Sequence, residues 1–85
     1  MNQEPLTLYK LIVLYMLDRV TFPLTTAQIS EFILEKEYTN FLTLQTAISE
    51  LTETGLAESR TLLNRTQLQI TEEGRNTLHF FERCV

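Results

Sequence analysis

The chain has 85 residues, enough for one domain with a single hydrophobic core. Its 44% hydrophobic and 21% charged residues exclude a disordered tail, and its formal net charge of −4 argues against strong nonspecific binding to nucleic acid. Because Cys84 is the only cysteine, an internal disulfide and a thiolate metal cluster are excluded, and a reducing compartment fits. The apolar run from Leu11 to Leu17 is far shorter than the roughly 20 residues that cross a bilayer. We therefore expect a cytoplasmic protein that contacts no membrane.

The first predicted helix runs from Pro5 to about Val20 and is apolar almost all round. A domain this small has too little material to enclose such a helix on every side, so we expect something outside the chain to cover one face. The face expected to be buried comprises Leu6, Tyr9, Val13, Met16, Leu17 and Val20. The face expected to be uncovered comprises Leu8, Leu11, Ile12, Leu14 and Tyr15, of which Leu8, Leu11, Ile12 and Tyr15 are the predicted dimer or partner contacts.

Two further helices follow. Thr25 and Gln28 have the spacing of a capping box, which predicts the start of a helix that reaches about Lys36. The segment 37–40 is predicted to be a turn, with Asn40 or Thr43 as the cap of the third helix. On that helix, one apolar face is expected to pack into the core, and Gly55 is expected to end the helix in the left-handed conformation. The apolar face consists of Leu44, Ala47, Ile48 and Leu51.

A hairpin and a last helix complete the chain. Residue types alternate over 56–62 and 66–71, and residues 63–65 suit a tight reversal. Thr71 is expected to cap a final helix with Leu78, Phe81 and Val85 on one face. The order helix, short strand, helix, helix, hairpin, helix predicts a mainly α fold with a small β-hairpin, the winged helix-turn-helix.

Three segments resemble winged-helix bacterial regulators of the PadR and MarR type. They are PLTTAQISEFI over 23–33, TLQTAISELTETGLAES over 43–59 and QITEEGRNTL over 69–78. Within that superfamily, the segment 8–38 looks closest to a bacterial family known only as a domain of unknown function. Members of that family usually carry a further C-terminal half. The resemblance therefore implies that residues 1–85 form a single winged-helix domain, the N-terminal domain of a longer protein. The absent half or a second copy would then cover the first and last helices.

The resemblance implies a DNA-binding transcription regulator that acts as a dimer. A winged helix places its third helix in the major groove and its hairpin, the wing, on the DNA backbone or in the minor groove. The candidate base readers are Thr43, Gln45, Thr46 and Ser49, since Gln can bond an adenine edge and Thr can contact a thymine methyl group. The candidate wing contacts are Arg60, Asn64 and Arg65. Glu50 and Glu53 would be repelled by phosphate unless they lie outside the contact zone.

Each of these features also has a purely structural interpretation. The third helix could present an ordinary solvated face, and the two arginines could be surface charges that discourage aggregation of the hairpin edge. The third helix contains neither Lys nor Arg, which favours a second hypothesis, a winged-helix module that binds another protein and not DNA. Tyr9, Tyr15 and the Phe80–Phe81 pair suit core or dimer packing better than a ligand pocket.

The sequence carries no pattern typical of an enzyme. The spacing of His79 and Cys84 does not place the two residues on one helical face, and Glu72 and Glu73 are accounted for by a helix N-terminus. A phosphate loop, a nucleophile elbow and metal-ligand spacing are all absent from the sequence. We expect neither a catalytic site nor a cofactor or metal.

Overall fold

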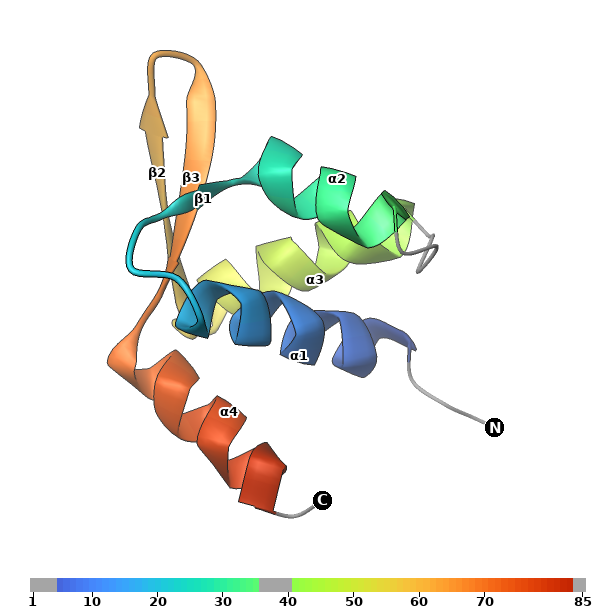
Figure 1. The fold of residues 1–85 in the computed structure, drawn as a ribbon, viewed down its shortest axis with the longest axis vertical. Coiled ribbons are helices and arrows are strands. Elements are labelled where there is room, and N and C mark those ends of the chain that lie inside the picture. Colours follow the sequence, from blue (N-terminus) through green and yellow to red (C-terminus); the bar gives the residue numbers. More distant parts are fainter. Residues whose placement is uncertain (1–4, 36–40, 84–85) are drawn as a thin grey trace.

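The computed structural model describes residues 5–35 and 41–83 and has the predicted element order (Figure 1). The elements are α1 (Pro5–Asp18), β1 (Leu24–Thr25), α2 (Thr26–Glu35), α3 (Phe41–Glu53), β2 (Ala57–Leu62), β3 (Arg65–Ile70) and α4 (Glu72–Arg83). The strands form one antiparallel sheet in the order β1-β3-β2. The β2–β3 hairpin projects from the helices as the wing, and α4 extends in the opposite direction (Figure 1). The prediction of an α+β winged helix is confirmed.

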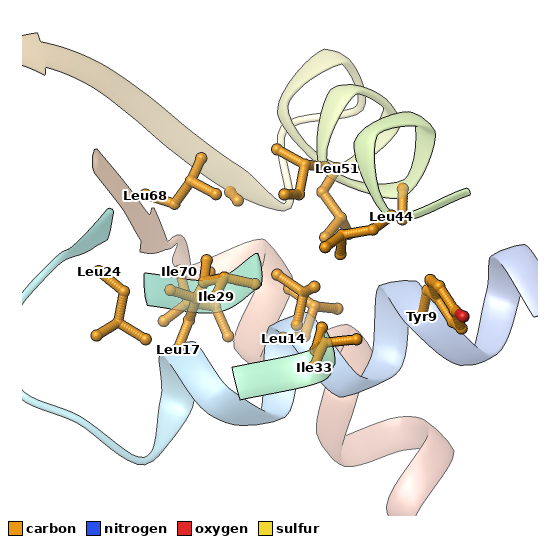
Figure 2. Packing of buried hydrophobic residues seen from close by; sticks show 14 of the residues in the cluster. Tyr9, Leu14, Leu17, Leu24, Ile29, Ile33, Leu44, Leu51, Leu68 and Ile70 are labelled. Atoms are coloured by element: carbon orange, nitrogen blue, oxygen red, sulfur yellow. The ribbon is translucent and has the colours of Figure 1, made fainter. Parts of the chain in front are cut away.

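The hydrophobic core lies between α1, α2, α3 and the base of the sheet (Figure 2). The apolar face predicted for α3 is confirmed, because its four members Leu44, Ala47, Ile48 and Leu51 are all buried. They pack with side chains from the other elements, among them Val13, Ile29 and Leu68. This packing fixes α3 against α1 and leaves the opposite face of α3 exposed to solvent.

Local hydrogen bonds confirm the predicted start of α2 and the predicted end of α3. The backbone N–H of Thr25 donates to Gln28 Oε1 at 2.9 Å, and the N–H of Gln28 donates to Thr25 Oγ1 at 3.0 Å, which is a reciprocal capping box. At the end of α3, Gly55 has φ 81°, and the N–H of Leu56 donates to the carbonyl of Leu51 at 2.9 Å. This bond is the 6→1 bond of a Schellman motif, which ends α3 and directs the chain into β2.

Thr71 and Gly74 attach α4 to the end of α3. Thr71 Oγ1 accepts a bond from the N–H of Gly74 at 3.0 Å, so Thr71 is the predicted cap, and the same hydroxyl donates to the carbonyl of Gly55 at 2.7 Å. A Cβ at position 74 would overlap the carbonyl oxygen of Leu56. Gly74 is therefore needed for close approach of two backbone segments, a role that helix propensity does not reveal.

The environment of α1 differs from the prediction in two respects. Leu14, expected on the uncovered face, is only 1% exposed, because α1 packs against α3, α4 and the sheet and its buried arc is wider than one amphipathic face. The prediction for Leu14 was wrong. The helix also ends at Asp18, before the predicted Val20, since the N–H of Arg19 bonds to the carbonyls of Tyr15 and Met16 in a tightened last turn.

The hairpin is tighter than predicted. Leu62 pairs directly with Arg65, so the loop has two residues, Leu63 and Asn64, and Arg65 belongs to β3. Both loop residues are in the left-handed region, with φ 50° and 66°, as the twist of a two-residue hairpin requires. This conformation suits Asn but costs a residue such as Leu roughly 1–2 kcal/mol. The strand bounds therefore shift by one residue, to 57–62 and 65–70.

The remaining predictions about element ends have mixed outcomes. Thr43 is not the cap of α3, because the helix already begins at Phe41. The predicted cap Asn40, the turn at 37–40, the helix end at Lys36 and the apolar Cys84 and Val85 lie outside the described residues. On α4, Leu78 is buried as predicted, whereas Phe81 remains 40% exposed.

Candidate nucleic-acid interface

The exposed face of α3 is polar along most of its length. Gln45, Thr46 and Ser49 are exposed on the side opposite the buried leucines, with Leu42 before them and Glu53 after them. These positions follow the spacing that forms one continuous helical face. Thr46 Oγ1 donates to the carbonyl of Leu42 at 3.0 Å, which leaves the lone pairs and the methyl group of Thr46 available on that face. The structure thus brings together three of the four predicted base readers.

Thr43, the fourth predicted base reader, lies on a different side of α3. It is half-buried and stands seven residues before Glu50, on the same side of the helix. Glu50 Oε1 is 2.6 Å from Lys10 Nζ, so this side of α3 faces α1. Gln45, Thr46 and Ser49 therefore share the exposed face of α3. Thr43 lies on the side of α3 that faces α1.

The Lys10–Glu50 ion pair also changes the charge of the exposed α3 face. The sequence suggested that Glu50 would repel phosphate, but its carboxylate is turned toward α1 and is matched by a cation. Glu53 is exposed in the last position of α3, at the end opposite Leu42. The first three turns of the exposed face are consequently free of acidic side chains.

The outer face of the wing carries both hairpin arginines. The register pairs Arg60 with Gln67 and Leu62 with Arg65, and residues directly opposite in an antiparallel pair share one face of the sheet. The other face of the wing packs Leu68 and Ile70 into the core. Arg60 and Arg65 therefore point away from the core together with Gln67.

The cations of the described part of the chain fall into two groups. Lys10, Arg19 and Arg75 each pair with a carboxylate, namely those of Glu50, Glu82 and Asp18. Within residues 5–35 and 41–83, Arg60, Arg65 and Arg83 make no ion pair. Two of these three unpaired arginines are on the wing. The structure therefore distinguishes paired from unpaired cations, which the sequence alone does not.

A polar groove of about 490 Å³ separates the wing tip from the first turn of α2. Asn64 and Arg65 line it on the wing side, and residues 25–28 line it on the helix side. Glu31 also borders the groove. The start of α2 and Arg65 thus border one polar concavity.

A second groove has a different chemistry. An apolar groove of about 940 Å³ runs between α1, α2 and α4, and we call it the α1–α4 groove. Leu11, Ile12 and Tyr15 line one wall, and Phe32 and Phe81 are among the other lining residues. At its edge, the Arg19 guanidinium lies 4.5 Å from the centroid of the Tyr15 ring. Three of the four predicted partner-contact residues line this groove, and Leu8 is exposed on the same helix.

Four large apolar residues on α3 and the wing are exposed without having been predicted to be so, and Leu62 in β2 is one of them. Phe41 and Leu42 begin α3 with exposed side chains, and Leu63 at the wing tip is 94% exposed. A signal for Leu63 was present, because a two-residue loop at the end of an exposed hairpin offers no core to enter. Leu42 could have been placed from the helical wheel, since it falls opposite Leu44, Ala47 and Leu51.

In residues 5–35 and 41–83, no group of three or more His, Cys, Asp or Glu side chains is placed to hold a metal ion. None of the helices in the same part of the chain is long and apolar enough to cross a membrane.

Comparisons with known proteins agree with this architecture. A family model described as a domain of unknown function, DUF4364, matches residues 9–85. A crystal structure of a PadR-like transcription factor from Bacteroides fragilis superposes with a TM-score of 0.73 at 16% sequence identity, covering 93% of this chain and 81% of that one. At this level of identity the likeness shows the winged-helix fold alone. No curated protein is significantly similar to the chain in sequence.

Proposed function

Because the chain belongs to the DUF4364 family and folds as a winged helix, we propose that it is the DNA-binding domain of a transcription regulator. In this proposal α3 lies in the major groove, where Gln45, Thr46 and Ser49 face the base edges. The wing lies on the backbone, where Arg60 and Arg65 meet phosphates. Asn64 forms the turn that connects the two wing strands.

The observation that carries this proposal is the distribution of paired and unpaired charge. In the described part of the chain, the cations away from the wing are neutralised by carboxylates, with the exception of Arg83, and the wing arginines are not. The acid nearest the middle of α3, Glu50, is neutralised by Lys10. Among the described residues, the wing therefore carries two unpaired arginines beside the helix that would read bases, and they outnumber the one unpaired carboxylate on the same outer face, that of Glu58.

The number of cations predicts weak binding by one protomer and stronger binding by a dimer. Each phosphate neutralised contributes about −0.9 to the slope of log affinity against log salt, so two arginines give a slope of about −2 and a dimer about −4. This proposal therefore includes a homodimer. Its contact is the α1–α4 groove together with Leu8.

The exposed area supports this choice of dimer contact. Tyr15, Phe22 and Phe81 are 47%, 56% and 40% exposed, and all three line the groove. An aromatic side chain presents about 150–250 Å² when fully exposed, so these and their apolar neighbours offer several hundred Å² on each copy. Two such faces approach the roughly 1,000 Å² that a specific interface needs. The alternative occupant is a further C-terminal half of a longer protein.

Salt-dependent DNA binding tests the proposed function. Fluorescence anisotropy with a random duplex of about 30 base pairs should show affinity falling about 100-fold between about 50 and 200 mM salt if a dimer binds. Arg65→Ala should reduce the slope by about half, since it removes one of two arginines on each protomer. Arg83→Ala is the matched control, because Arg83 is also unpaired in the described chain but lies at the end of α4. Equal slopes for the two variants, or no binding at low salt, would contradict the proposal.

A second candidate function is a module that binds another protein and not DNA. The observation in its favour is that α3 contains no Lys or Arg and begins with exposed Phe41 and Leu42. An exposed helix start with two large apolar side chains is a typical protein contact. The same titration separates the candidates, because this module would not bind the duplex at low salt.

A further inference from the structure

The wing tip combines an unfavourable backbone conformation with an exposed apolar side chain. Leu63 has φ 50°, in the region that L-residues with a branched side chain rarely adopt. Its side chain is 94% exposed, more than any other large hydrophobic residue that the structure describes. The neighbouring Leu62 is also half-exposed, on the outer face shared with Arg65.

The Leu63 side chain gains no burial within the domain that would offset the cost of this conformation. A two-residue hairpin loop is formed most readily by Asn or Gly, and Leu63 takes the place of such a residue. The register of β2 and β3 holds the loop in place, so Leu63 is held at a defined position and does not fold back onto the sheet. A large apolar side chain presented in this way, beside the unpaired Arg65, is suited to enter a narrow cleft with negatively charged edges.

We propose that Leu63 is an apolar wedge that the wing inserts into the minor groove of bound DNA. This inference rests on the proposed DNA-binding function and adds the tip residue and its mode of readout. Apolar wedges such as leucine enter the minor groove at base steps that unstack easily. Arg65 lies at the start of the strand that follows the tip, where it can contact the phosphates at the edge of that groove.

The length of the wing is sufficient for this contact. Each wing strand has six residues, and a rise of about 3.4 Å per residue gives a ribbon of about 20 Å. One helical turn of DNA measures about 34 Å, so the minor groove lies about 17 Å from the centre of the adjacent major groove. A wing that starts at the end of α3 therefore spans the distance between the two grooves.

This mode of contact predicts a sequence preference without base hydrogen bonds. Leucine has no donor, acceptor or charge, so it can only contact the apolar sugar walls and the faces of partly unstacked bases. Pyrimidine–purine steps such as TA are the easiest to unstack, whereas uninterrupted A-tracts are stiff and narrow. The wedge should therefore favour alternating TA sequence over an A-tract of the same base composition. Its contribution should not depend on salt, because no counterion is released.

The experiment measures affinity for three duplexes of equal length, about 30 base pairs each. One contains alternating TA, one an A-tract and one only G·C pairs. The wild-type chain should bind the TA duplex about tenfold more tightly than the A-tract, and Leu63→Asn should abolish this difference without changing the salt slope. Leu63→Met, which keeps an apolar side chain of similar reach, should retain it. A 2-aminopurine placed at the TA step should fluoresce with the wild-type chain and with Leu63→Met only.

The folding of the variant provides an internal check. Asn tolerates the left-handed conformation, so Leu63→Asn should raise Tm by about 4 °C while DNA binding is weakened. If Leu63 had only a structural role, Leu63→Asn would change Tm and DNA affinity in the same direction. If Leu63→Asn keeps the TA preference, or lowers affinity equally for all duplexes with a smaller salt slope, the wedge is overturned and DNA binding stands. If the wild-type chain binds none of the duplexes, the proposed function is overturned together with the wedge.

Discussion

The two sides of this domain present exposed side chains of different kinds. On the side of the α1–α4 groove, large apolar side chains such as Tyr15, Phe22 and Phe81 are exposed, and Arg19 is paired with Glu82 at its edge. On the side of α3 and the wing, the exposed positions are mostly polar, and Arg60 and Arg65 have no carboxylate partner in the described part of the chain.

The difference between the two surfaces fits the proposed function, in which one small, acidic domain contacts DNA with one surface and a second copy with the other. Neutralised charge at the edge of an apolar groove lowers the cost of burying that groove against another protein surface. Unpaired arginines on a ribbon retain their full attraction for a polyanion. The net charge of −4 describes neither side, because it averages over both.

The largest expected effect comes from Gly74, which joins the two sides. Gly74→Ala should destabilise the domain by about 3 kcal/mol, because the added Cβ overlaps the carbonyl of Leu56 and α4 must move away. Thermal unfolding should show Tm lowered by more than 10 °C. Gly55→Ala is the matched control. Gly55 has φ 81° but open space around a Cβ, so that variant should lose only about 1 kcal/mol. Equal losses for the two variants would show that α4 is not held by close backbone approach.

The next largest effect tests the apolar side. Tyr15→Glu places a charge in the α1–α4 groove and should weaken a homodimer by more than 30-fold, about 2 kcal/mol. Light scattering should then report the 9.9 kDa of one chain where the wild type gives twice that mass. The monomer should remain folded, because Tyr15 is 47% exposed and Glu can pair with Arg19 one turn later. Tyr15→Phe should leave the dimer intact. A wild-type monomer, or a dimer that survives Tyr15→Glu, would remove this groove from the proposal.

The smallest effect tests the polar side. Lys10→Met removes the partner of Glu50 and leaves an acid beside the exposed face of α3. DNA affinity at low salt should fall about threefold, and stability should fall by only about 0.5 kcal/mol because the pair is partly exposed. Adding Glu50→Gln should restore the affinity, since it removes the unpaired charge. If the double variant does not recover the DNA affinity, Lys10 itself contacts DNA and Glu50 has no influence on the affinity.

Features set by neighbouring residues could be predicted from the sequence. The capping box of Thr25 and Gln28, the left-handed Gly55 and the apolar face of α3 all follow from interactions within one or two helical turns. The wing also followed, because alternation and a tight turn are properties of adjacent residues. Three of the four candidate base readers could be placed on one face for the same reason.

The features that were missed depend on contacts between distant segments. The burial of Leu14 depends on the elements packed around α1, and the neutral environment of Glu50 depends on Lys10, forty residues earlier in the chain. The need for Gly at position 74 comes from the backbone of Leu56. Contacts between such distant segments cannot be read from the spacing or the composition of the residues.

By itself, the sequence determined the helices, the start of α2, the end of α3 and the winged-helix order, because backbone hydrogen bonds and apolar periodicity act over a few residues. Only the tertiary structure decided which charges are neutralised, which apolar side chains remain exposed and where the two sides of the domain lie. Those properties arise when segments far apart in the chain are packed together, and they are what distinguish a surface suited to DNA from one suited to protein.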